Sequence, residues 1–350
     1  MILNRVEHLM RSRGGRFLFT AGSAALAFAF AALAARQFAE ARWPLSRGNP
    51  GLLVGAGALS LLGYAFKAYG WRQLFARHER PQPLALLAAN GGASITALAL
   101  PGRFDDVVRV AIVRRFRECP AGVRTICLSL AMLGLIDAAA LTPFALAAAL
   151  IPGHSPGIRL GLVLLTCIGL AAGAVVLVLP RAARSRRVLR FRLGRWITPR
   201  TTSSRGAVLA WALVSAYWVT RALGLVLVLG ALGVGFSFTL ALLFLCATSA
   251  ASALPVGPGA IATQAGAGAA VLIASGVGVS DAVGVALAVQ AVGMVVGGSI
   301  LLFATAWQAG CRHHAIWSAT EAESRTQQSN ALAMWEDEGG LVSLWEARAV

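Results

Sequence analysis

Charged side chains are scarce in this sequence: they make up 13% of its 350 residues, about half the share found in ordinary soluble domains. Apolar residues account for 57% and occur in blocks of about 20, the length that crosses a hydrocarbon core roughly 30 Å thick. A soluble domain would interrupt such blocks with polar residues at the period of a helix or a strand. The scarcity of charge therefore excludes a soluble globular protein and predicts an all-α integral membrane protein.

Acidic residues are fewer still, 14 against 31 basic ones, which gives a formal net charge of +17. The basic residues lie between the apolar blocks, as the positive-inside rule describes. They do not form a basic face interleaved with aromatic residues, so no nucleic-acid partner is expected. Lysine is almost absent, since Lys67 is the one lysine. Its place near the end of an apolar block predicts that its ammonium reaches the membrane interface.

Enzymatic and metal-binding motifs are also missing. The sequence contains no H-E-x-x-H, no P-loop and no C-x-x-C, which are the spacings typical of metalloproteases, nucleotide-binding proteins and thiol sites. We therefore expect no enzymatic activity, no metal and no cofactor. The cysteines are scattered and are interpreted as small apolar fillers; they are Cys119, Cys127, Cys167, Cys246 and Cys311.

About six apolar blocks are long enough to cross the membrane. They cover residues 17–35, 51–71, 126–151, 160–179, 207–232 and 282–307. A basic segment, 1–16, begins the chain, and a polar, partly disordered tail, 312–350, follows the membrane domain, 17–311. The linker 181–205 holds nine arginines and no acid, so it marks the cytoplasmic side. We expect a multi-pass protein of the bacterial inner (plasma) membrane with both termini in the cytoplasm.

Two further apolar blocks, 84–100 and 238–254, are rich in small residues and close with Leu-Pro. Pro101 and Pro255 are 154 positions apart, and each block lies between two predicted spans. The arginine distribution is consistent only if both blocks turn back on the side from which they enter. This pattern predicts two broken helix pairs in an inverted repeat, with half-repeats at about 17–151 and 160–307.

Broken helices at membrane depth are tolerated where they face a water-filled cavity. The charged segment that follows Pro101 contains Arg103, Asp106 and Arg109. Guanidinium groups bind phosphate oxygens in pairs, and an acid between two arginines can orient them. The segment therefore indicates a site for a lipid phosphate. The alternative is an amphipathic interfacial helix with a solvated charged face.

Two charges fall near the middle of predicted spans, Asp137 and Arg221. Charges at such depth face a partner or a cavity, and their similar depths predict an Asp137–Arg221 ion pair. It would be either a gate or substrate contact, or a structural pair.

The second broken block supplies the opposite side of the predicted cavity. Pro255, Pro258 and Gly259 would line it. Gln264, which follows them, is either a further contact to a head group or a side chain that bridges helices.

The motifs Pro101-x-Arg103-x-x-Asp106-x-x-Arg109 and Pro255-x-x-Pro258-Gly259 resemble those of the lysylphosphatidylglycerol synthase transmembrane-region family, a flippase-like membrane domain. The resemblance covers about residues 17–310. It implies movement of lipids with polar or charged head groups between leaflets. Some relatives carry a soluble aminoacyl-transferase domain, which we do not expect here because the chain leaves no room for one.

The chain departs from the family pattern at several positions. Asp105 stands where the family usually has glycine, and Ala260 and Ala262 replace glycines of its Pro-Gly-Gly-x-Gly turn. Gln264 and Ala265 stand where the family has an acid. The site of the second half is therefore chemically altered.

These observations favour a flippase-like protein that moves or binds a membrane lipid with a phosphate-containing, anionic head group. A first alternative is a membrane-embedded lipid-linked transferase, for which Asp105, Asp106 and Asp137 are the candidate bases. A second alternative is a non-transporting partner in a complex that makes envelope lipids or glycans. A homo-oligomer also remains open.

Overall fold

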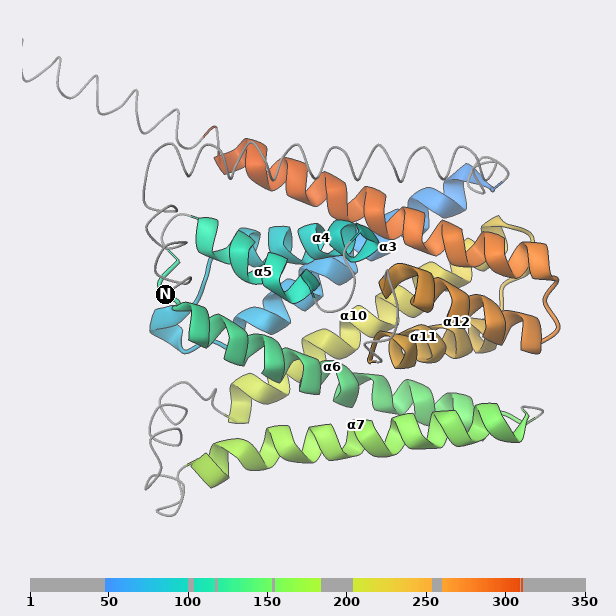
Figure 1. Ribbon diagram of the computed structural model, residues 1–350, viewed down its shortest axis with the longest axis horizontal. Helices are drawn as coiled ribbons and strands as arrows, with labels where there is room; N and C mark the ends of the chain where they lie inside the picture. The colour runs from blue at the N-terminus through green and yellow to red at the C-terminus, as the bar shows by residue number, and fades with distance from the viewer. Residues whose placement is uncertain are drawn as a thin grey trace, which may run out of the picture. The chain divides into compact units, whose positions relative to one another are not determined.

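The computed structural model is helical, and the part of the chain that it describes contains no strand (Figure 1). The all-α membrane class predicted from the scarcity of charge is therefore confirmed. The predicted span 17–35, most of the arginine-rich linker and the C-terminal tail lie outside the described residues. The described residues are 48–99, 104–116, 119–152, 155–183, 204–253, 260–308 and 310.

Five of the described helices are long and apolar enough to cross a membrane, and each coincides with a predicted span. They are α3 (Pro50–Arg72), α6 (Val123–Leu150), α7 (Pro156–Ala183, apolar as far as Val178), α10 (Ser204–Ala231) and the unlabelled helix Val279–Gln308. A chain with several such helices is a multi-pass membrane protein.

Two pairs of short helices occupy the positions of the predicted broken blocks (Figure 1). The first pair is α4 (Pro83–Ala99) and α5 (Phe104–Arg115), and the second is α11 (Phe238–Ala253) and α12 (Ala260–Ala274). The two helices of each pair pack against each other. At 1.5 Å per residue, none of them reaches the roughly 30 Å of a hydrocarbon core. A single-turn helix, η2 (Arg77–Glu79), joins α3 to the first pair.

The helix order repeats along the chain. Each helix of the series α10, α11, α12 and Val279–Gln308 begins 154 to 156 positions after its counterpart in the series α3, α4, α5 and α6. The counterparts α3 and α10 run antiparallel, because the Asn49 N–H donates to the Ala231 carbonyl at 3.0 Å while Gly70, near the other end of α3, packs on Ala210. Equivalent helices of opposite direction are what an inverted repeat requires.

The helices α3 and α10 approach closely because α3 carries glycine on the face between them. Gly55, Gly63 and Gly70 follow one another at intervals of about two helical turns and all face α10. A Cβ atom at Gly63 would lie 2.8 Å from the Thr220 hydroxyl, and one at Gly70 would lie 3.3 Å from a backbone oxygen of α10. Small residues allow such contacts between membrane helices. The remaining faces of α3 meet α4 and α6.

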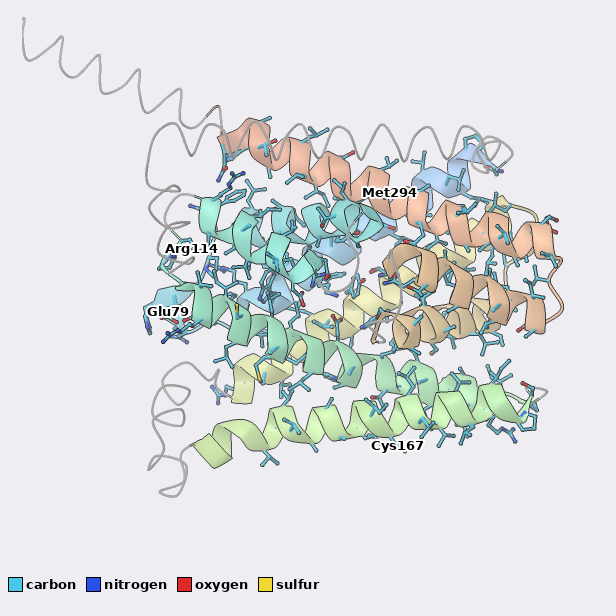
Figure 2. All side chains as sticks on the ribbon, viewed as in Figure 1. Glu79, Arg114, Cys167 and Met294 are labelled. Atoms are coloured by element: carbon cyan, nitrogen blue, oxygen red, sulfur yellow. The ribbon has the colours of Figure 1, made fainter. Side chains whose placement is uncertain are left out.

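Helix α7 packs chiefly on α6 and turns a row of apolar side chains outward. Cys167 is one of its exposed residues and points away from the neighbouring helices (Figure 2). A soluble monomer rarely exposes so large an apolar surface, whereas a helix that contacts lipid tails does. The exposed large side chains of α7 are Leu160, Val163, Leu164, Ile168, Leu170, Val175, Leu177 and Val178.

The described chain divides into two units, Met1–Leu301 and Leu302–Val350. The described part of the second unit is the end of the helix Val279–Gln308, where the rings of Phe303 and Trp307 lie 6.2 Å apart, together with Gly310.

The crossing of α4 with the helix Val279–Gln308 tests the packing. A Cβ atom at Gly91 would lie 2.6 Å from the Gly297 carbonyl oxygen, so Gly91→Ala must push two backbones apart. We expect this substitution to lower the free energy of unfolding by about 1–3 kcal/mol, measured as a lower melting temperature in detergent. Gly134→Ala is the matched control, because a Cβ atom at Gly134 meets nothing within 4 Å. Equal melting temperatures for the two variants would contradict this packing.

Candidate functional site

An ion pair joins α3 to α6, five residues before the end of α3 and at the middle of α6. The Lys67 ammonium donates to Asp137 Oδ2 at 2.7 Å, and the two side chains are 13% and 23% exposed. Four residues further along α3, the Trp71 indole N–H donates to the Ser129 hydroxyl at 2.9 Å. The two contacts follow the antiparallel register of α3 and α6, so the register itself brings Lys67 to Asp137.

Helix α10 adds a second cation beside this pair. Arg221 Nη1 donates to the Tyr217 hydroxyl at 2.6 Å, and its guanidinium carbon lies 5.8 Å from the centre of the Trp218 ring. The Lys67 ammonium lies 4.7 Å from the centre of the Tyr217 ring. Tyr217 therefore stands between the two cations and stabilises both, one through its ring and one through its hydroxyl.

The predicted ion pair between Asp137 and Arg221 does not form. Asp137 pairs with Lys67, while Arg221 contacts Tyr217 one turn earlier on its own helix. The expectation that Lys67 reaches the membrane interface is also wrong, because its ammonium is directed into the bundle toward α6. Lys67, which binds Asp137, lies against the Tyr217 ring whose hydroxyl Arg221 contacts, so Asp137 and Arg221 belong to one cluster but are not direct partners.

Two features of the sequence mark Lys67 and Asp137 as unusual residues, although neither feature shows that they are partners. Lys67 is the single lysine in a chain whose other strongly basic side chains are all arginine. Asp137 is the only acidic residue between positions 119 and 280. A side chain that is unique over such a distance, in a chain that otherwise avoids charge at this depth, indicates a specific contact.

Helix α4 contributes uncharged polar groups to the same region. The Tyr64 hydroxyl, one turn before Lys67 on α3, shares a hydrogen bond of 2.5 Å with the Ser94 hydroxyl. Asn90 lies four residues before Ser94, so the two share a face of α4. Asn90 is 2% exposed, and neither polar atom of its amide has a partner among the described residues. Buried polar groups are normally satisfied, so this amide calls for a water molecule or a ligand.

Helix α5 carries the charged motif that the sequence singled out. Arg109 donates to Asp106 Oδ1 at 2.7 Å and lies 3.4 Å from Asp105 Oδ2. The three side chains are between 20% and 39% exposed. Helix α5 packs on α4 and α6, the helices that carry Ser94 and Asp137. The motif on α5 and the cluster around Lys67 are therefore parts of one site.

The described residues of this site form the polar centre, and they come from five helices. They are Tyr64 and Lys67 of α3, Asn90 and Ser94 of α4, Asp105, Asp106 and Arg109 of α5, Asp137 of α6, and Tyr217 and Arg221 of α10. Within the described ranges, no group of three His, Cys, Asp or Glu side chains is arranged to hold a metal ion.

Several predicted site residues lie outside the described residues: Pro101, Arg103, Pro255, Pro258 and Gly259. Gln264 is described; it lies half-buried on α12. No charged side chain occurs on α11 or α12. The two helix pairs are therefore similar in arrangement and different in chemistry, as the departures in the second motif predicted.

Thermodynamic coupling tests the geometry of the ion pair. Replacing one partner of a buried pair leaves the other uncompensated, whereas replacing both removes the charge altogether. For Lys67→Gln, Asp137→Asn and the double variant, we expect a coupling energy of about 1–3 kcal/mol in the free energy of unfolding. The same cycle with Arg221→Gln should give a smaller coupling to Asp137. A stronger coupling to Arg221 would show that the pairing is wrong.

The chain matches the family model described as the lysylphosphatidylglycerol synthase TM region over residues 16–300. This range contains all five helices of the polar centre. No curated protein and no solved structure matches the chain. Because the match covers far more than half of the 350 residues, the chain belongs to the lysylphosphatidylglycerol synthase TM region family.

Proposed function

We propose that this protein moves a lipid with a phosphate-bearing head group between the leaflets of the bacterial inner membrane. The observation that carries the proposal is the polar centre, where charged side chains of four helices lie together inside an apolar bundle and stay partly exposed. Placing charge at such depth is costly, and it marks a pathway for polar or charged substrates.

The cations of the polar centre have further N–H groups that could donate hydrogen bonds to a phosphate. Lys67 uses one N–H for Asp137, and Arg221 uses one for Tyr217. An ammonium and a guanidinium each have further N–H groups, and hydrogen bonds between charged groups are the strong ones. A phosphate within reach of both cations would receive bonds from Lys67 and from Arg221. Arg109, held by Asp106, would meet the same head group from α5.

The inverted repeat supports movement as well as binding. In transporters built this way, the substrate site lies near the midplane at the interface of the repeats, and broken helices line it. Here α3 and α10, the equivalent helices, contribute Lys67 and Arg221, and the α4–α5 pair contributes Arg109. Rocking of one half against the other would open the polar centre to each leaflet in turn.

The uncharged second helix pair makes this site asymmetric. The first half would hold the head group, whereas α11 and α12 offer an apolar and weakly polar surface. Such a surface suits acyl chains or the glycerol backbone. A partner protein that binds lipid without moving it would have the same asymmetry. The rate of lipid movement therefore has to be measured.

Transport in vesicles tests the proposal. In reconstituted vesicles with labelled phosphatidylglycerol, we expect label to leave the outer leaflet faster than in empty vesicles. Arg221→Gln should slow this movement about ten-fold or more, because a hydrogen bond to a charged group contributes about 1.5–3 kcal/mol. Arg159→Gln, which removes an exposed arginine at the start of α7, is the matched control and should leave the rate unchanged.

The outcomes separate the candidate functions. Movement no faster than in empty vesicles would contradict a flippase. Co-purified envelope-synthesis proteins would then favour a non-transporting partner. A new lipid detected by mass spectrometry after incubation with an activated donor would favour a transferase, with Asp137 as the candidate base.

A further inference from the structure

We propose that the site takes up one proton for each anionic head group that it binds, and that Asp137 receives this proton. The inference rests on the proposed function, since it concerns the same site, and it adds a second substrate: the protein would carry an anionic lipid and a proton together. The Lys67–Asp137 ion pair is the observation behind it.

A bound phosphate competes with Asp137 for the Lys67 ammonium. Its ammonium is committed to Asp137 Oδ2 at 2.7 Å and lies against the Tyr217 ring. A phosphate that bonds to this ammonium occupies the position of the carboxylate. Head-group binding therefore displaces Asp137 from its partner.

The displaced Asp137 carboxylate lacks hydrogen-bond partners. Asp137 Oδ1 is already buried with no hydrogen-bond partner among the described residues. Once Oδ2 loses Lys67, neither oxygen has a hydrogen-bond partner among the described residues, and a carboxylate without a partner inside a membrane protein is costly. Taking up a proton is the least costly way to relieve this.

The charge count gives the same result. The described charged side chains of the polar centre balance, because Lys67, Arg109 and Arg221 are opposed by Asp105, Asp106 and Asp137. A phosphate diester adds one negative charge. One proton restores the balance, so the loaded site can change its exposure to the two leaflets without carrying a net charge through the bilayer.

The groups that face Asp137 leave it as the natural acceptor. From α3 it meets Lys67, and from α10 Tyr217 and Arg221 lie near it. From α5 the nearest charged groups are Asp105, Asp106 and Arg109, and these two acids keep Arg109 as their partner when Lys67 is taken. The described parts of α7 and α11 carry no acidic side chain toward it, and their titratable groups are Arg159, Cys167 and Cys246.

The proton transfer is simple to balance. A hydronium ion from the water that reaches the site gives its proton to Asp137 Oδ1, and a water molecule remains. On release of the lipid, Lys67 returns to Asp137, and the carboxyl group loses the proton to water on that side.

The pH dependence of binding tests the inference. The probe is short-chain phosphatidylglycerol, whose phosphate diester stays singly charged near neutral pH, added to the full chain in detergent. Because the complex holds one proton more than the free protein, acid favours binding. We expect the Kd to rise about ten-fold for each unit of pH across the range in which only the complex is protonated. About one proton per bound lipid should leave the solution, measured with an indicator dye.

Variants assign the proton to Asp137. Asp137→Asn should bind the same lipid with a Kd that does not change with pH and without proton uptake. Asp281→Asn, which neutralises an exposed acid in the first turn of the helix Val279–Gln308, is the matched control and should keep the ten-fold dependence. Asp137→Ser serves the same purpose if the asparagine variant does not fold.

Each outcome bears on a stated claim. A Kd for the unaltered protein that is flat with pH would overturn the proton inference while leaving lipid binding in place. No binding of phosphatidylglycerol at any pH would remove the proposed function as well. Glycerophosphoglycerol, the same head group without acyl chains, separates the possible ligands: tighter binding of this soluble diester than of the lipid would mean that the site serves a soluble phosphate ester.

Discussion

The ion pair between Lys67 and Asp137 is the constraint around which the rest of this bundle is arranged. Two charges inside a membrane-spanning bundle are tolerated only if each has a partner and polar surroundings. The glycine face of α3 brings α10 close enough for Tyr217 to cover the ammonium. The register of α3 with α6 brings the carboxylate. The short helix α4 adds the Ser94 hydroxyl, which bonds to Tyr64 of α3. The short helix α5 adds Arg109 to the same centre.

The inverted repeat gives this pair its place. The helices α3 and α10 are counterparts that run in opposite directions and pack against each other. Lys67 and Arg221 are the cations contributed by the two halves. The halves differ in chemistry: α5 carries two acids and three arginines, whereas α12 carries no charged side chain. A symmetric framework with an asymmetric site can hold a head group on one side and apolar chains on the other.

Much of the fold follows from the sequence, and part of the site does not. Block length and the Leu-Pro interruptions predict the long helices and the two short pairs, because hydrocarbon thickness and proline act locally. The contact between Arg109 and Asp106 is also local, three residues apart on one helix. The partner of Asp137 depends instead on the register between α3 and α6, which involves residues 70 positions apart. By depth alone, Arg221 is as good a candidate as Lys67 for the partner of Asp137. Only the packing of the helices shows that Lys67 is the partner.

A density map of the protein with bound phosphatidylglycerol tests the central claim most directly. The account predicts a phosphate oxygen about 2.7–2.9 Å from Lys67 Nζ, the distance of a charge-assisted hydrogen bond. It also predicts a further oxygen within reach of Arg221 and an Asp137 carboxyl group that has moved away from Lys67. A lipid bound elsewhere on the protein, with the Lys67–Asp137 pair intact, would contradict it.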